Sequence, residues 1–327
     1  MVVSSDTNRG RTPESLGGRL KARSRVGWKG CGTSLVTPFD ERGRIDFDAI
    51  DRLVSWQIDQ GVDFLVSCGA TGESATISGD ERRTVTAAVV QAAAGRVPVV
   101  AGAGGNHTAK SVFWARDASK AGADGVLSVT PDSRPSTEGL FRHFSAIADA
   151  TDLPILVSNV PSRTGTDLSV EAVLRLAEIP NVVGLKESSE DFFKIAKLSA
   201  VRPEAFLLFA GNDVTAPALL GLGADGLISD AANEIPAEIS HLVRACLEGN
   251  WAEARRLHRK VFALMEANGL EASPGPVKCA LALMKRCGET ARLPAVPVGD
   301  DTRRRIEAVL AGLKLLPKAR GRAASTR

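Results

Sequence analysis

The sequence contains no tyrosine, and it has few of the residue types that hold metals. Without a phenol, acid–base chemistry has to rest on carboxylates, amines, imidazoles or weaker hydroxyl groups. The four histidines, at positions 107, 143, 241 and 258, form no cluster with cysteine or acid. The sequence therefore predicts no metal site. The five cysteines are odd in number and include no CxxC pair, which indicates free thiols in a reducing compartment.

Long apolar runs and a strong charge of one sign are also missing. No run approaches the length of a membrane span, and the polar residues 1–6 lack the apolar core of a signal peptide. The net charge is only +3, with basic residues concentrated in residues 19–29 and 318–322. Nucleic-acid binding would need a basic stripe interleaved with aromatics, which is absent. We expect a cytoplasmic protein that binds neither membrane nor nucleic acid.

What remains is the composition of an ordinary globular protein, with 44% hydrophobic and 24% charged residues in 327 positions. Strand-like apolar runs alternate with segments of helical spacing. The strand-like runs fall at residues 32–39, 64–68, 97–101, 125–129, 153–157, 182–186, 206–210 and 226–229. Eight such units predict an α/β fold, a (β/α)8 TIM barrel. A doubly wound open sheet is the alternative, but the glycine-rich turn at 102–106 follows the third strand instead of the first.

The pattern also predicts where the barrel begins and ends. We expect residues 1–28 to be a disordered or loosely attached segment and 29–235 to form the barrel. Residues 236–316 should supply the last barrel helix and a C-terminal helical extension, followed by a basic disordered tail at 317–327. Inside the barrel, Ser78 and Ser136 are typical helix starts, and glycines in three Gly-x-Asp turns should end helices in a left-handed conformation. These glycines are Gly61, Gly122 and Gly223.

One cationic residue closes a run that otherwise predicts a fully buried strand. Lys186 ends the apolar stretch 182–186, at the carboxyl end of the sixth strand, where barrels of this type place their chemistry. An amine in an apolar mouth has a depressed pKa and can condense with a ketone to form a Schiff base. The alternative is a rim lysine that pairs with Glu187 or another carboxylate.

Several motifs occur together and in order: GxTGE at 69–73, NVPSRTG at 159–165, GLKE at 184–187, Pro276-Val-Lys278, and Arg292-Leu-Pro294. In this combination the chain resembles the dihydrodipicolinate synthase and N-acetylneuraminate lyase family of class I aldolases. The likeness runs from about residue 32 to residue 316. It supports the barrel with a C-terminal helical extension, and it implies a homo-oligomer, either a dimer or a tetramer.

The resemblance implies a role for individual residues. Lys186 would form the Schiff base with pyruvate or a related 2-keto acid, without an external cofactor. Thr71 and backbone groups of the 69–73 loop would hold the keto-acid carboxylate. Arg163 would bind the carboxylate of a second substrate, aspartate semialdehyde, because a guanidinium grips a carboxylate with two parallel hydrogen bonds. The alternative for Arg163 is a salt bridge that braces its loop. The other expected substrate contacts are Gly69, Ala70, Gly211 and Ile228.

The chain departs from the family pattern at the proton relay. Ser158 stands where the family has a catalytic tyrosine, and Ala70 replaces a second hydroxyl residue of the GTTGE motif. A further tyrosine after the fourth strand is missing as well. Ser158, with a bound water, is the first candidate for its catalytic role, although a hydroxyl is a weaker proton donor than a phenol. Asp132, Ser133 or Asp230 are alternative proton paths.

Three functions follow as hypotheses. The first is a lyase or synthase that condenses pyruvate with an aldehyde such as aspartate semialdehyde, as in lysine and diaminopimelate biosynthesis. The second is a lyase or dehydratase of the same family that acts on another keto acid or sugar acid. The third is a catalytically impaired paralogue that binds a keto acid without turnover.

Overall fold

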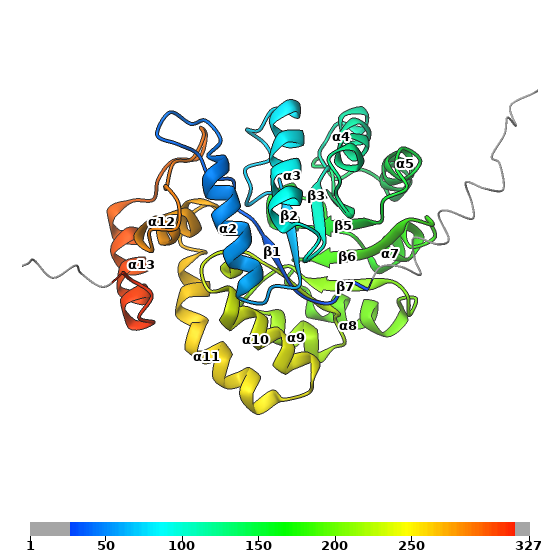
Figure 1. Ribbon diagram of the computed structural model, residues 1–327. Helices are drawn as coiled ribbons and strands as arrows, with labels where there is room; N and C mark the ends of the chain where they lie inside the picture. Colours follow the sequence, from blue (N-terminus) through cyan, green and yellow to red (C-terminus); the bar gives the residue numbers. More distant parts are fainter. Residues whose placement is uncertain (1–26, 318–327) are drawn as a thin grey trace, which may run out of the picture.

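Eight parallel strands form the centre of the computed structural model, which describes residues 27–317 (Figure 1). Each strand pairs with the next along the chain, and β1 also pairs with β8, so the barrel is closed. The strands are β1 (Gly30–Ser34), β2 (Phe64–Ser67), β3 (Val99–Gly102), β4 (Gly125–Val129), β5 (Ile155–Asn159), β6 (Val182–Glu187), β7 (Leu207–Ala210) and β8 (Gly226–Ser229). The predicted (β/α)8 TIM barrel is confirmed, and the open-sheet alternative is wrong.

Helices cover the outside of the barrel between successive strands. They are α2 (Phe47–Asp59), α3 (Gly79–Ala93), α4 (Thr108–Lys120), α5 (Thr137–Ala148), α6 (Pro161–Thr164), α7 (Val170–Leu176), α8 (Phe192–Val201) and α9 (Ala216–Gly221). After β8 come the 3-10 helix η1 (Ala231–Asn233) and the helices α10 (Pro236–Leu247), α11 (Trp251–Ala267), α12 (Gly275–Leu283) and α13 (Asp300–Gly312).

Local signals in the sequence set several of these boundaries. Ser78 caps α3, and its side chain forms a reciprocal capping box with Glu81. Ser136 caps α5 by accepting a hydrogen bond from a backbone N–H one turn later. The glycines of the three Gly-x-Asp turns have φ values of 88°, 83° and 93°, at Gly61, Gly122 and Gly223. The predicted helix starts and left-handed turns are confirmed.

Large apolar side chains fill the barrel interior and leave its carboxyl-terminal mouth to the polar residues. Phe64 and Phe209 meet edge to face, with ring centroids 5.4 Å apart, and pack with Val183 and Ile228. Trp28 stacks on Phe64 and is only 7% exposed. The core therefore begins one residue earlier than the predicted boundary, because the interior at this end has room for an indole ring. The rest of the predicted N-terminal segment lies outside the described residues, as does the tail after residue 317.

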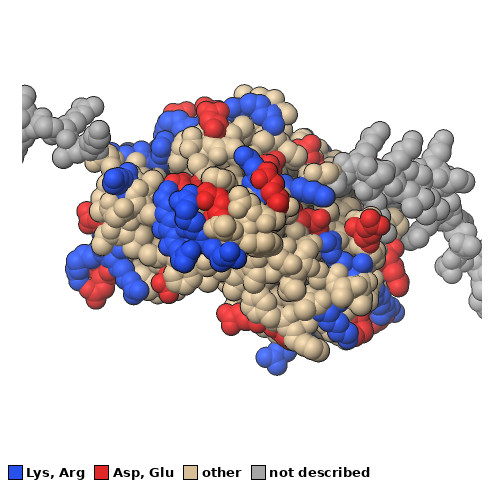
Figure 2. All heavy atoms as spheres, turned by 90° about the horizontal axis from the view of Figure 1, so that it is seen from below, with Lys and Arg blue, Asp and Glu red and all other residues tan. Residues whose placement is uncertain are grey.

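The C-terminal helices pack against one side of the barrel (yellow to red in Figure 1). Helix α11 contacts α10 and α13, and α13 also contacts α12. On the face shown in Figure 2, basic and acidic side chains lie next to one another, as the small net charge predicts. Across residues 27–317, none of the helices has the length and apolar character that a bilayer span requires.

Candidate active site

A cavity of about 380 Å³ opens at the carboxyl ends of the strands, the edge at which barrels of this architecture carry their sites. Its walls come from the loops after nearly all the strands and from the loop that follows α11. Seven of the eight predicted site residues line this cavity: Gly69, Ala70, Thr71, Ser158, Arg163, Lys186 and Gly211. Ile228 does not line it, because its side chain is fully buried in the apolar interior of the barrel. Its role in substrate binding stays a prediction.

Lys186 lies on β6 and faces the cavity. Within residues 27–317 its amine has no hydrogen-bond or ion-pair partner at bonding distance. Burial lowers the pKa of Lys186; the negative charges of Asp230 and Asp213 oppose this, and the positive charge of Arg163 adds to it. Gly211 makes room for the side chain, because a β-carbon on Gly211 would lie 2.9 Å from Cε of Lys186. The arrangement favours the neutral amine more than an exposed site would, and it leaves the side chain of Lys186 room at Gly211.

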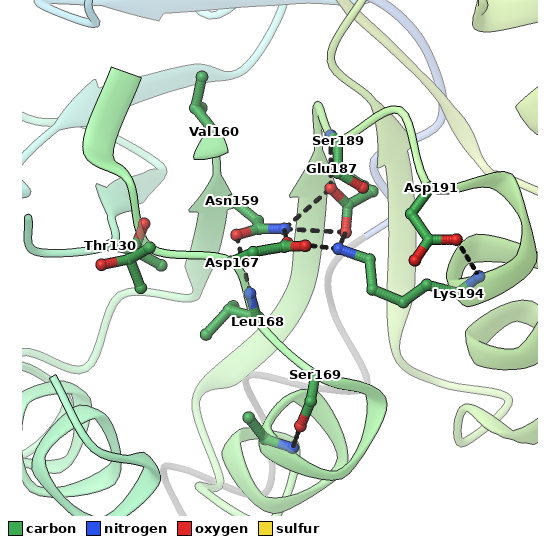
Figure 3. Close-up of polar contacts among 12 residues, drawn as sticks. Thr130, Asn159, Val160, Asp167, Leu168, Ser169, Glu187, Ser189, Asp191 and Lys194 are labelled. Atoms are coloured by element: carbon green, nitrogen blue, oxygen red, sulfur yellow. Dashed lines mark hydrogen bonds and ion pairs between the residues drawn. The ribbon is translucent and has the colours of Figure 1, made fainter. Parts of the chain in front are cut away.

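Glu187 follows Lys186 on β6, and successive residues of a strand point to opposite sides. Figure 3 shows the side chain of Glu187 beside Asn159 and Lys194. Its carboxylate accepts hydrogen bonds from Asn159 Nδ2 at 2.9 and 3.1 Å and from the Ser189 N–H at 2.7 Å. Lys194 Nζ forms an ion pair with Glu187 Oε2 at 3.3 Å. The alternative in which Lys186 pairs with Glu187 is therefore wrong.

The same network joins the ends of β5 and β6 (Figure 3). Asn159 also donates to Asp167 at 2.7 Å and accepts from the Leu168 N–H at 3.2 Å. Lys194 lies 2.5 Å from the same carboxylate of Asp167. Because Ser158 and Lys186 pair across these two strands, the buried network fixes the relative position of the two predicted catalytic residues.

The loop after β2 offers backbone donors to the cavity. Among the described residues, the N–H groups of Ala70 and Thr71 meet no acceptor. Backbone N–H groups that converge in a turn form a cradle for anions. The side chain of Thr71 is committed elsewhere: its hydroxyl donates to Asp230 Oδ1 at 2.6 Å. The backbone of this loop can thus hold a carboxylate, whereas the hydrogen of the Thr71 hydroxyl is already in use.

Arg163 lies on the short helix α6 and lines the cavity with an exposed side chain. Its guanidinium forms no ion pair within the part of the chain that the structure describes. The salt bridge that would brace the loop is therefore not present. A guanidinium free of carboxylates at the mouth of a cavity is suited to binding a carboxylate from solution.

The four candidate proton donors differ in whether they line the cavity. Ser158 lines the cavity and is buried, but no described residue forms a hydrogen bond with its hydroxyl. Asp132 lies outside the cavity, where its carboxylate and N–H bond to the Asn106 side chain at 2.5 and 2.8 Å. Ser133 is exposed and does not line the cavity. Asp230 lines it, and the structure thus brings Ser158 and Asp230 to the site and leaves the other two outside.

Two cavity residues were not foreseen as parts of the site. Ser34, at the end of β1, donates to the Thr71 hydroxyl at 3.0 Å. Asp213 follows β7 and accepts hydrogen bonds from the Ser229 hydroxyl and, at 3.1 Å each, from the N–H groups of Asp230 and Ala231. Burial, aided by the charge of Asp230, raises the pKa of Asp213 to about 6. Their positions at strand ends were a signal, but nothing local distinguishes Ser34 from other buried hydroxyls.

Metal binding finds no support in the described residues, since no group of three or more His, Cys, Asp and Glu side chains is arranged around a common point. The five cysteines are all free, and four of them are buried. Burial raises the pKa of Cys287, the remaining one, to about 11, so none of them offers a ready thiolate.

Comparisons with known proteins agree with this geometry. The model of the dihydrodipicolinate synthetase family matches residues 28–313. The 4-hydroxy-tetrahydrodipicolinate synthase of Koribacter versatilis is 46% identical over 293 residues, which cover 89% of this chain and 98% of that protein. The solved dihydrodipicolinate synthase of Aquifex aeolicus has 36% sequence identity and a TM-score of 0.87, and covers 89% of this chain and 100% of its own.

A third relative was solved with a ligand bound. The dihydrodipicolinate synthase of Acinetobacter baumannii, solved in complex with pyruvate, shares 36% identity and a TM-score of 0.86, over 88% of this chain and 99% of that one. Both the family model and the relatives span almost the whole of the described barrel and its C-terminal helices. The resemblance inferred from the motifs is therefore confirmed, and the chain belongs to the dihydrodipicolinate synthetase family.

Proposed function

We propose that this protein is a Schiff-base-forming lyase that condenses pyruvate with an aldehyde, aspartate semialdehyde being the first candidate. The observation that carries the proposal is the state of Lys186. Its amine lies in a closed barrel's mouth, burial lowers its pKa, and among residues 27–317 it has no direct partner. A structural lysine would be paired, whereas a nucleophile has to be free. The names of its relatives support the same activity.

In the proposed reaction the keto acid binds first. Its carboxylate would accept hydrogen bonds from the N–H groups of Ala70 and Thr71, which places the keto carbon toward Lys186. Attack by the neutral amine, followed by loss of water, gives an imine that withdraws electrons from the neighbouring carbon. That carbon can then lose a proton and attack an aldehyde. The imine itself is the electron sink, so the reaction requires no external cofactor.

The second substrate would be held by Arg163. Its guanidinium lines the cavity without a protein carboxylate, and aspartate semialdehyde carries a carboxylate that can accept two parallel hydrogen bonds from it. The cavity of about 380 Å³ is in the range of small-molecule sites. We further propose that the chain forms a homodimer or homotetramer in the cytoplasm, with free thiols consistent with a reducing compartment.

The missing tyrosines favour a second candidate. If nothing replaces the phenols, the protein would bind a keto acid on Lys186 and turn over poorly, or act on a different keto acid or sugar acid. The side chain of Ser158 has no hydrogen-bond partner among the described residues, which is the observation on which this alternative depends.

Borohydride trapping with pyruvate, followed by peptide mass mapping, tests the proposal. We expect a reduced adduct on Lys186 and none on Lys278. The latter is an internal control, because it is a buried lysine held by the carboxylate of Glu73. The variant Lys186→Met serves as the matched control and should give no adduct.

Turnover is measured separately, as pyruvate consumption after addition of aspartate semialdehyde. An adduct together with turnover supports the synthase. An adduct without turnover supports the impaired paralogue or another second substrate. If pyruvate at high concentration leaves Lys186 unmodified, the proposed Schiff-base function is overturned.

A further inference from the structure

A chain of three hydrogen-bonding side chains crosses one wall of the cavity. Ser34 Oγ donates to Thr71 Oγ1 at 3.0 Å, and Thr71 Oγ1 donates to Asp230 Oδ1 at 2.6 Å. The three residues come from three separate segments, at the ends of β1, β2 and β8, and all of them line the cavity. Ser34 and Thr71 are almost completely buried. Their hydroxyls fix the orientation of the Asp230 carboxylate.

The other oxygen of Asp230 is not engaged. Within residues 27–317, Oδ2 accepts no hydrogen bond, whereas the neighbouring Asp213 is bound on both of its oxygens. Among the charged neighbours of Lys186, Asp230 has the largest electrostatic effect on its pKa. A carboxylate that is oriented by one oxygen, free at the other and close to a reactive amine has the geometry of a general acid or base.

We propose that Asp230 is the catalytic acid and base of this site, with Thr71 and Ser34 as the residues that position it. This inference rests on the proposed Schiff-base function. It assigns to a carboxylate the proton transfers that the absent tyrosines cannot perform, and it replaces Ser158 in that role. Ser158 lacks both features that Asp230 has, namely a hydrogen-bonded orientation and a carboxylate, which is a better proton acceptor than a hydroxyl.

The proton balance of imine formation is as follows. The ammonium of Lys186 gives a proton to the carboxylate of Asp230, which leaves a neutral amine and a neutral acid. The amine nitrogen forms a bond to the keto carbon, and the carbonyl oxygen takes a proton from that nitrogen. Asp230 then protonates the resulting hydroxyl, the carbon–oxygen bond breaks, and water leaves. The products are a protonated imine and the Asp230 carboxylate.

The same group serves the next steps. The Asp230 carboxylate removes a proton from the methyl carbon of the pyruvate imine, and the electron pair moves to the nitrogen to give a neutral enamine. When the enamine carbon attacks the aldehyde, Asp230 returns the proton to the aldehyde oxygen. A protonated imine is formed again, and water hydrolyses it to release the product and the Lys186 ammonium, the state in which the cycle began. Over the cycle, Asp230 gains and loses equal numbers of protons.

Several other charged groups interact electrostatically with Asp230 or with Lys186 and will shape any pH profile. They are Lys186 on β6, Arg163 on α6, Asp213 after β7 and Glu234 after η1. The pKa of Asp213 is about 6, and burial raises that of Glu234 as well. A change in the pH profile alone would therefore not single out Asp230, and a direct measure of proton removal is needed.

Exchange of the methyl protons of pyruvate in D₂O provides that measure, because it requires enamine formation but no second substrate. Followed by NMR, the unchanged protein should exchange these protons at a rate that falls about 10²- to 10⁴-fold in Asp230→Asn. The amide keeps an oxygen for the Thr71 hydroxyl but cannot carry the proton. Long incubation of Asp230→Asn with pyruvate and borohydride should still give the adduct on Lys186.

Three further variants sharpen the result. Asp301→Asn, a carboxylate-to-amide change at a residue 95% exposed on α13, should leave exchange unaltered. Ser34→Ala tests the positioning role: we expect the exchange rate to fall about tenfold at saturating pyruvate and its pH profile to shift, with little change in the pyruvate concentration needed for half-saturation. Ser158→Ala should lower the exchange rate less than Asp230→Asn does.

The outcomes separate this inference from the function on which it rests. If the unchanged protein neither exchanges protons nor gives an adduct, the Schiff-base function fails. If it does both, and Asp230→Asn exchanges within about threefold of the unchanged protein, the assignment of Asp230 is overturned and the function stands. If the exchange rate falls further in Ser158→Ala than in Asp230→Asn, the assignment of Asp230 is also overturned. The role of acid and base then returns to Ser158.

Discussion

Lys278 is fully buried and Lys186 is half-buried at the cavity, and their surroundings differ as well. Lys278, on α12, is paired with Glu73, donates to the Thr290 carbonyl at 2.8 Å and lies 4.3 Å from the centre of the Phe39 ring. Lys186 has no such contacts among the described residues. Burial lowers the pKa of both amines, and at Lys278 the direct ion pair with Glu73 opposes that shift.

The difference shows that one lysine supports the fold and that the other is left free to react. At Lys278 the charge is fully satisfied, and the pair ties the C-terminal helices to the loop that carries Ala70 and Thr71. Arg292 strengthens this connection, because its N–H donates to Glu73 at 2.9 Å. At Lys186 the charges are close enough to act on the amine but not to bind it. A satisfied lysine supports the fold, and an unsatisfied one can react.

The largest effect that this comparison predicts is on activity. Lys186→Met should lower turnover by on the order of 10⁴-fold or more, because no other amine takes the place of the nucleophile. The free energy of unfolding should change by no more than about 1 kcal/mol, since an apolar side chain replaces an unpaired buried amine. Steady-state kinetics measures the loss of turnover, and urea denaturation measures the free energy of unfolding. Turnover within tenfold of the unchanged protein would contradict the assignment.

Lys278→Met should give the opposite result, with a loss of about 3–5 kcal/mol in the free energy of unfolding, because Glu73 is left buried without its cation. Urea denaturation measures the loss. The double variant Lys278→Met with Glu73→Gln is the control and should recover part of it, because the uncompensated charge is gone. A loss below about 1 kcal/mol for the single variant would show that the pair does not support the fold.

Arg292→Ala should have a smaller effect, about 1–3 kcal/mol, because the guanidinium is partly exposed. The hydrogen bonds from Arg292 lower the pKa of Glu81 to about 2. A depressed carboxyl pKa stabilises the fold above the unfolded value and loses that contribution as pH falls toward 2. The variant should therefore lose less stability than the unchanged protein between about pH 4.5 and 2. Equal acid sensitivity in both would argue against the Glu81–Arg292 contact.

The smallest expected effect concerns the pH dependence of the Lys186 amine. Because burial lowers its pKa, the initial rate of borohydride trapping should reach half its maximum below about pH 10.4, where an ordinary lysine titrates. The charged neighbours are Arg163, Asp213 and Asp230. Asp230→Asn removes a negative charge that favours the ammonium form of Lys186. In that variant the midpoint of the trapping rate should therefore lie at a still lower pH. A midpoint at or above that of an ordinary lysine would contradict the environment described here.

Much of the fold follows from periodicity. Buried apolar runs separated by helical spacing predict eight strands, and all but one of the observed strand ends lie within two residues of the predicted ones. The first strand differs more, since it ends at Ser34, well before the predicted Phe39. The chain from 35 to 39 stays buried without joining the sheet, because Val36 and Thr37 bond instead to the Asn233 side chain and the Gly72 carbonyl. No local pattern reveals such partners.

The site was predictable only in part. Lys186, Arg163 and Thr71 stand out because their residue types are unusual at strand ends or belong to motifs. The use of the Thr71 hydroxyl by Asp230 joins residues that are 159 positions apart. The pairing of Glu187 with Lys194 instead of Lys186 depends on which face of the strand each side chain takes. Contacts between distant strand ends are consequences of barrel closure, which sequence spacing alone does not specify.

The sequence by itself determined the class of fold, the family and the candidate for the reactive amine, because apolar periodicity, helix caps and short motifs are local properties. Only the tertiary structure decided which charges surround that amine and which stay away from it. The barrel brings Ser34, Thr71 and Asp230 into one hydrogen-bonded chain and leaves Asp132 outside. Electrostatic interactions depend on distance in space, so the chemistry of Lys186 is settled by closure of the barrel.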